Sequence, residues 1–158
     1  MEMPKPSDAH RKLERLVGNW IGQETIAKNP WDEGGPAIGR VNNRSAVDGF
    51  VVVQDYEQER NGKVGFCGHA VFSYDAANDS YLLHWWDSMG LPPNIFKGTV
   101  EGDTLTLTCD DGPMKSRATF NVGDNKYGFL MEMSQDGTNW MTFMEGSYER
   151  QSAAGAAA

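Results

Sequence analysis

Residues 81–90, YLLHWWDSMG, place a histidine, two tryptophans and an aspartate side by side. A neutral imidazole can hydrogen-bond a ligand, bind a metal or act as a base. Bulky aromatic side chains beside a few polar groups are typical of a buried ligand site. We therefore expect His84 and Trp86 to contact a small molecule. The same residues also suit a strand whose histidine faces outward or is satisfied within the fold.

Alternation along this strand divides its side chains into two sets. The sets are Leu82, His84, Trp86 and Ser88, and Tyr81, Leu83, Trp85 and Asp87. Both sets are partly apolar, so the alternation does not identify the inward face. We expect His84 to face inward, because it lies away from the strand ends, where charged groups are easily solvated. The competing orientation makes Trp85 and Asp87 the inward pair and leaves His84 in solvent.

A second kind of chemistry, acid–base catalysis, is offered by other ionisable residues. Glu57 lies in the run QDYE, and His69 lies on the following segment. An enzyme would use His84 or His69 as its base, with Asp87 or Glu57 nearby. An acidic strand face in solvent explains the carboxylates as well, because the chain carries a formal charge of −8.

The histidines and cysteines do not have the spacing of a metal site. The chain holds three histidines and two cysteines, without an i, i+4 histidine pair or a CxxC motif. Short zinc motifs use such spacings. We therefore predict neither a metal nor a cofactor. We expect Cys67 and Cys109 to be free thiols in a reducing cytoplasm.

The composition argues against several classes of partner. The chain has 14 basic and 22 acidic residues, whereas nucleic acid and anionic membranes attract a basic patch. It contains no run of about 18 apolar residues that could span a membrane. Its N-terminal residues lack the apolar region of a signal peptide. We therefore expect a cytoplasmic protein that contacts neither nucleic acid nor membrane.

The elements that must position these residues begin with one short helix. Residues 1–6 predict a leader, and Ser7 is a typical N-cap for a helix over residues 8–17. Leu13 and Leu16 share one face of that helix, and Gly18 ends it. A helix with so short an apolar stripe must pack against something larger.

The rest of the chain predicts about ten β-strands. Short runs of alternating apolar and polar residues are separated by turn sequences. Asn61-Gly62 and Asp136-Gly137 are examples, and they supply the positive φ that tight hairpins require. The expected strands cover residues 19–28, 37–47, 50–60, 64–74, 80–88, 94–101, 104–110, 115–122, 126–135 and 139–150.

Sequential strands joined by tight turns predict an all-β fold, a single up-and-down antiparallel barrel with the helix near one end. Closure of the barrel removes the exposed sheet edges. Residues 7–150 would form this domain, and residues 151–158, QSAAGAAA, a disordered tail. The longest irregular stretch, residues 29–36, predicts a loop at the barrel mouth, with Trp31 on the surface or capping the opening.

The interior of such a barrel is either filled by side chains or encloses one ligand. Alternation within residues 126–135 places Phe129, Met131 and Met133 on one face. Methionine adapts to irregular apolar volumes. We predict that these three residues form the apolar wall of a pocket together with Leu107 and Phe120. Ordinary core filling explains the same residues.

Residues 16–20, LVGNW, resemble the Gly-x-Trp signature of the lipocalin and fatty-acid-binding superfamily. In that superfamily the tryptophan closes the barrel base, which implies a structural role for Gly18 and Trp20. With DGF, QDYE, HWWDSMG and MSQDG further along, residues 16–150 resemble a large, mostly bacterial family of lipocalin-like domains without an assigned reaction. The chain is also similar in plan to nitrobindin-type haem barrels, so haem is an alternative cofactor.

These observations predict reversible binding of a small apolar or amphipathic molecule inside the barrel. The first alternative is an enzyme that uses a cavity histidine as acid or base, and the second is a haem-binding barrel. The third is a ligand-free module that forms a homodimer through an exposed tryptophan. The fold alone does not decide among these functions.

Overall fold

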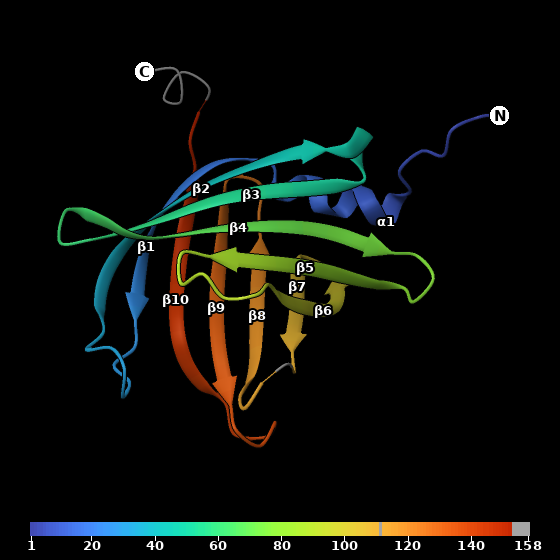
Figure 1. Ribbon diagram of the computed structural model, residues 1–158. Helices are drawn as coiled ribbons and strands as arrows, with labels where there is room; N and C mark the ends of the chain where they lie inside the picture. Colours follow the sequence, from blue (N-terminus) through green and yellow to red (C-terminus); the bar gives the residue numbers. More distant parts are fainter. Residues whose placement is uncertain (111, 153–158) are drawn as a thin grey trace.

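The computed structural model describes residues 1–110 and 112–152 and shows a closed barrel of ten antiparallel strands (Figure 1). Each strand pairs with its neighbours in sequence, and the first strand closes against the last. The predicted fold class is therefore confirmed. The strands are β1 (Gly18–Ile26), β2 (Gly35–Ala46), β3 (Val51–Arg60), β4 (Lys63–Asp75), β5 (Ser80–Asp87), β6 (Asn94–Glu101), β7 (Thr104–Cys109), β8 (Lys115–Val122), β9 (Lys126–Ser134) and β10 (Met141–Arg150).

The N-terminal helix differs from the predicted helix over residues 8–17. One α-helical turn, α1 (Asp8–Arg11), is followed by a 3-10 helix, η1 (Lys12–Leu16). Ser7 caps α1, and its N–H donates to Nδ1 of His10 at 3.1 Å. Leu13 and Leu16 are buried. Residues three apart align on one face of a 3-10 helix, so the tighter winding turns both leucines toward the barrel.

The two ends of the barrel differ in how they are covered. The helical segment lies at one end, away from the β1–β2 and β9–β10 turns (Figure 1). It is fastened there because the Tyr81 hydroxyl donates to the Ala9 carbonyl at 2.6 Å and Arg15 forms an ion pair with Asp103. We call this the closed end. The other end, which the β1–β2, β3–β4, β5–β6, β7–β8 and β9–β10 turns surround, is the mouth.

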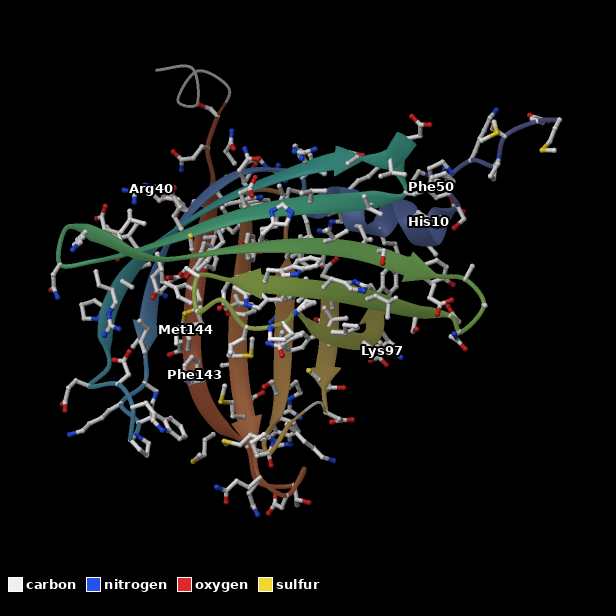
Figure 2. The ribbon with its side chains drawn as sticks, viewed as in Figure 1. His10, Arg40, Phe50, Lys97, Phe143 and Met144 are labelled. Carbon is white, nitrogen blue, oxygen red and sulfur yellow. The ribbon has the colours of Figure 1, made fainter. Side chains whose placement is uncertain are left out.

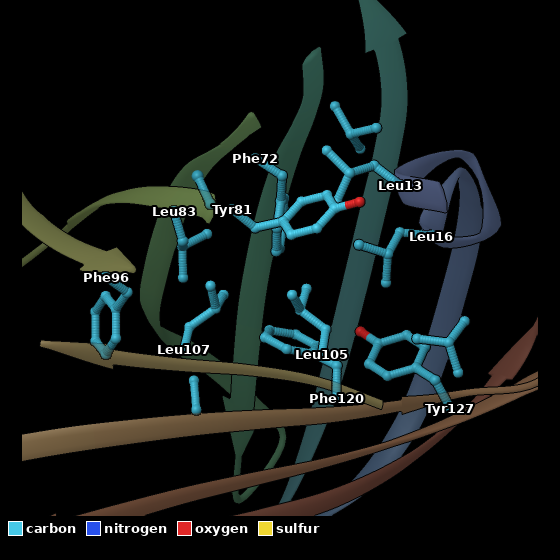
Figure 3. Close-up of a cluster of buried hydrophobic side chains, with 14 of the residues drawn as sticks. Leu13, Leu16, Phe72, Tyr81, Leu83, Phe96, Leu105, Leu107, Phe120 and Tyr127 are labelled. Atoms are coloured by element: carbon cyan, nitrogen blue, oxygen red, sulfur yellow. The ribbon is translucent and has the colours of Figure 1, made fainter. Parts of the chain in front are cut away.

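Apolar side chains fill the closed end, where Leu13 and Leu16 pack into the barrel (Figure 3). Trp20 is 2% exposed, and its Nε1 donates to the Leu16 carbonyl at 2.9 Å. Its ring meets Tyr127 edge-on at a centroid distance of 4.9 Å, and the Arg150 guanidinium lies 4.2 Å above it. Trp20 thus joins the helical segment to both the first and the last strand.

The two cysteines do not form a disulfide. Cys67 is exposed, Cys109 is buried, and both are free thiols. The N–H of Gln151 donates to the Asn19 carbonyl at 2.7 Å, whereas residues 153–158 of the predicted tail lie outside the described residues. Within the described chain, no helix has the length and apolar character needed to cross a membrane.

Replacing Trp20 with alanine should lower the free energy of unfolding by about 3–5 kcal/mol, because the change empties a large buried volume. Urea denaturation measures the loss. The control is Thr25→Ala on the exposed face of the same strand, which should change stability by less than about 0.5 kcal/mol. Equal denaturation midpoints for Trp20→Ala and the wild-type protein would contradict this role for Trp20.

Candidate functional site

The mouth half of the barrel holds a cavity of about 510 Å³. This volume falls within the range of about 300–1,000 Å³ typical of small-molecule sites. Its deepest lining includes Val41, Phe72 and Tyr127, which also belong to the core of the closed end. The cavity therefore rests on packed apolar side chains and opens toward the turns of the mouth.

Most of the predicted wall residues line this cavity. Phe120, Phe129, Met131 and Met133 are all part of the lining. Leu107 is fully buried in the core and is not part of the lining. Its side chain belongs instead to the packed core cluster.

The expected orientation of His84 and Trp86 is wrong. On β5 the side chains that line the cavity are those of Leu83, Trp85 and Asp87. His84 and Trp86 occupy the intervening positions and point outward, and Trp86 is 40% exposed. The competing orientation, with Trp85 and Asp87 as the inward pair, is the one that the barrel adopts.

Small residues on β4 explain why Trp85 is the inward tryptophan. Ala70 lies directly opposite Trp85 in the β4–β5 register. Gly68 lies under the Trp85 ring, and a Cβ atom at that glycine would collide with the ring. These two positions leave room inside the barrel for the indole, whose Nε1 donates to Oδ2 of Asp87 at 2.8 Å.

The histidines of β4 and β5 form an outer cluster with Trp86. His69 Nδ1 lies 2.8 Å from Oδ1 of Asp55, and the Trp86 ring lies 6.2 Å from the His69 ring and 6.3 Å from the His84 ring. His10, the third histidine, accepts a hydrogen bond from the Ser7 N–H in the capping box of α1. No histidine is among the described residues that line the cavity, and the enzyme alternative stays a prediction. The homodimer stays a prediction.

A buried carboxyl group, that of Glu24 on β1, lies behind the cavity wall and is 1% exposed. The Tyr56 hydroxyl donates to it at 2.7 Å, the Tyr148 hydroxyl donates to it as well, and Gln58 Nε2 donates at 3.1 Å. Burying such a group without partners would be costly, and these hydrogen bonds offset that cost. The network ties β1, β3 and β10 together.

Three glycines make room for the Glu24 network. A Cβ atom at Gly39 would collide with the Glu24 carboxyl group, and one at Gly22 would collide with the Tyr148 ring. At Gly146 an added Cβ would lie 2.7 Å from the Tyr148 hydroxyl oxygen. Because these positions carry no side chain, the tyrosine lies flat against the barrel wall and leaves the interior open.

A β-bulge in β10 enlarges the apolar lining. The β9–β10 register shifts between Thr142 and Met144. The extra residue, Phe143, and its neighbour Met144 both line the cavity, although consecutive strand residues normally face opposite sides (Figure 2). The bulge thus adds an aromatic ring and a thioether to the same region of the wall.

Gln54 is a buried polar residue of the lining that has no hydrogen-bond partner among the described residues. Its side chain lines the cavity and is 7% exposed, and no described residue forms a hydrogen bond with it. Among the described buried residues, the only enclosed side-chain polar atom without a partner is Oδ1 of Asn43. The Gln54 amide also lacks a partner but is not among these enclosed atoms, so it is open to the cavity.

An ion pair holds the rim of the mouth. Arg60 donates to both carboxylate oxygens of Asp32, at 2.7 and 3.0 Å, and to the Gly34 carbonyl at 3.2 Å. Hydrogen bonds from Arg60 and from the Gly34 N–H lower the pKa of Asp32 to about 2. Trp31, beside this pair, is 77% exposed and lines the opening, as expected for the loop over residues 29–36.

The polar residues of the interior were missed, although Gln54 and Tyr56 lie in the run QDYE, because only the carboxylates of that run suggested chemistry. A signal was present, however, since Trp20, Gly22 and Glu24 have the same parity on β1. The signature tryptophan points inward, so alternation places the carboxyl group inward as well. On β3 the same argument relates Gln54 to Gln58.

The lining does not fit a haem bound through histidine or thiolate, which are common axial ligands. All three histidines and both cysteines lie outside the cavity lining. Among the described lining residues there is also no lysine or arginine to pair with the haem carboxylates. Absence of any cofactor stays a prediction.

Two solved structures are similar to this barrel in fold. A crystal structure of Rv2717c from M. tuberculosis has a TM-score of 0.72 at 15% identity, over 92% of this chain and 99% of that one. An S-type phycobiliprotein lyase, CPES from Guillardia theta, has a TM-score of 0.64 at 12% identity, over 94% and 99% of the two chains. These similarities show a shared fold.

Residues 5–150 match the model of a family described as "Protein of unknown function (DUF1579)", and the chain belongs to that family. No curated protein matches the chain significantly in sequence.

The Glu24 network predicts a large effect of one substitution. Glu24→Leu should lower the free energy of unfolding by about 1–3 kcal/mol for each tyrosine hydroxyl that it leaves without an acceptor. Glu24→Gln keeps one acceptor oxygen and should cost less. Thermal denaturation compares both variants with the wild-type protein. A Glu24→Leu variant as stable as wild type would contradict the role assigned to the network.

Stability should also fall at alkaline pH. Burial, followed by the negative charge of Glu24, raises the pKa of Tyr56, Tyr127 and Tyr148 above the ordinary value of 10.0. Unfolded tyrosines ionise near that value. The stabilisation that comes from burying the neutral hydroxyls is therefore complete below pH 10 and is lost as the pH rises further.

The alkaline effect can be followed by the ultraviolet absorbance of tyrosinate and by circular dichroism in the same pH series. These three tyrosines should ionise only as the barrel unfolds. Tyr127→Phe removes one of the three groups and should lessen the loss of stability. Ionisation of all five tyrosines in an intact barrel would contradict the prediction.

Proposed function

We propose that this protein binds a small apolar or amphipathic molecule reversibly inside its barrel. The observation that carries the proposal is the cavity of about 510 Å³ in the mouth half, lined by aromatic and methionine side chains. Side chains of a barrel of this size can fill the interior completely. Here the glycine positions beside Glu24 and Tyr148 keep part of it open.

The chemistry of the lining supports the same proposal. Phe66, Phe96 and Phe129 offer flat apolar surfaces, and Met131 and Met144 adapt to ligands of different shapes. Burial of a ligand against such surfaces contributes about 25 cal/mol for each Å² of apolar area removed from water. Affinity would therefore come mainly from the apolar wall, with orientation set by the few polar groups.

A neutral fluorescent dye, Nile red, tests the proposal. We expect its emission to rise when it binds the wild-type barrel. Ser116→Trp should abolish the rise, because Ser116 lines the cavity and lies next to the β7–β8 turn at the mouth. Thr119→Trp places the same side chain on the outer face of β8 and should leave dye binding unchanged.

Two further results bear on the site. His84→Phe should also leave dye binding unchanged, since His84 points outward. If the wild-type barrel fails to bind the dye, or if Ser116→Trp binds as well as Thr119→Trp, binding in the cavity is contradicted. Circular dichroism of each variant establishes that the comparison is made between folded proteins.

A further inference from the structure

We propose that the ligand of this cavity is uncharged and carries an amide-type group, a hydrogen-bond donor beside an acceptor, which binds Gln54 on the cavity floor. This inference rests on the proposed function and specifies its ligand. Fatty-acid-like carboxylates are the class that it excludes. Three features of the molecule support it: the unpartnered amide of Gln54, its depth in the barrel, and the charges of the lining.

The Gln54 amide differs from the other glutamine of the lining in its hydrogen bonds. Gln54 is 7% exposed, lines the cavity, and has no hydrogen-bond partner among the described residues. A buried amide without a partner costs free energy that the same fold could avoid with leucine. By contrast, Gln58 lies four residues further along β3 on the same face, and it donates to Glu24 and to Tyr56. Gln58 has a structural role, whereas the donor and acceptor of Gln54 are free for a ligand.

The position of Gln54 along β3 determines how deep in the barrel it lies. β3 enters the barrel from the closed end at Val51, and Arg60 lies at the mouth. Gln54 is opposite Asn43 in the β2–β3 register, and the Asn43 amide donates to the carbonyl of Leu16 in the helical segment at 2.8 Å. Gln54 thus lies near the closed end. A ligand that reaches it must enter with its polar group first and leave its apolar part between the Phe and Met side chains above.

The charged residues of the lining are acidic. None of the described lining residues is lysine, arginine or histidine, whereas Asp32 and Asp87 belong to the lining and Glu24 lies directly behind it. Arg60, at the rim, is already paired with Asp32. A ligand carboxylate would lose its hydration, meet like charges and find no cation. A neutral amide, in contrast, gives and accepts one hydrogen bond each with the Gln54 side chain.

The experiment displaces Nile red with two probes that share one hydrocarbon chain, dodecanamide and dodecanoate. Dodecanamide should compete at least about tenfold more strongly with the wild-type barrel, the effect of one or two buried hydrogen bonds. Gln54→Leu keeps much of the side-chain volume and should lose that preference, with each competition scaled to the variant's own affinity for Nile red. Gln23→Leu, the same substitution on the exposed face of β1, is the matched control.

The outcomes separate this inference from the function on which it rests. If Nile red binds but dodecanoate competes as well as dodecanamide, the inference is overturned and cavity binding stands. Undiminished dodecanamide binding by Gln54→Leu overturns it in the same way. If Nile red does not bind at all, the proposed function is contradicted, and the inference that rests on it is overturned as well. Gln54→Met, a second variant of similar length, replaces Gln54→Leu if the latter does not fold.

Discussion

The hydrogen bonds around Glu24 hold together the part of the barrel where closure is most demanding. β1 and β10 are the first and last strands, and the Tyr148–Glu24 hydrogen bond joins residues 124 positions apart. Contacts so distant in sequence carry the largest loop-closure entropy. The Tyr56 and Gln58 side chains extend the network from this seam to β3. Because the network draws these side chains onto the wall, it also keeps the space beside them open.

The interior therefore contains two kinds of polar residue, which differ in whether other residues of the protein form hydrogen bonds with their side chains. Glu24 and its donors form a closed set, and removing one member should damage the fold. Gln54 lies on the same wall and has no hydrogen-bond partner among the residues that the structure describes. In a core that satisfies nearly all of its buried polar atoms, such a residue is better explained by what binds the protein than by what stabilises it.

The strands, their order and much of the cavity wall could be predicted, because alternation and turn residues are local signals. The inward face of β5 could not be predicted from that strand alone, since tryptophan occurs at both parities. The β4–β5 hairpin contained the missing information: Phe72 pairs with Leu83 and Ala70 with Trp85, and opposite residues share a face. The Glu24 network joins strands far apart in sequence, so no local pattern predicts its partners.

Nuclear magnetic resonance of the glutamine side-chain amides tests the central claim, that ligands occupy the interior beside Gln54, most directly. The Gln54 signals are assigned by their loss in Gln54→Leu. During a titration with dodecanamide we predict large shifts of the Gln54 amide protons and unchanged signals from Gln23 on the outer face. Shifts confined to the outer cluster of His69, Trp86 and His84, with the Gln54 signals unmoved, would contradict the account.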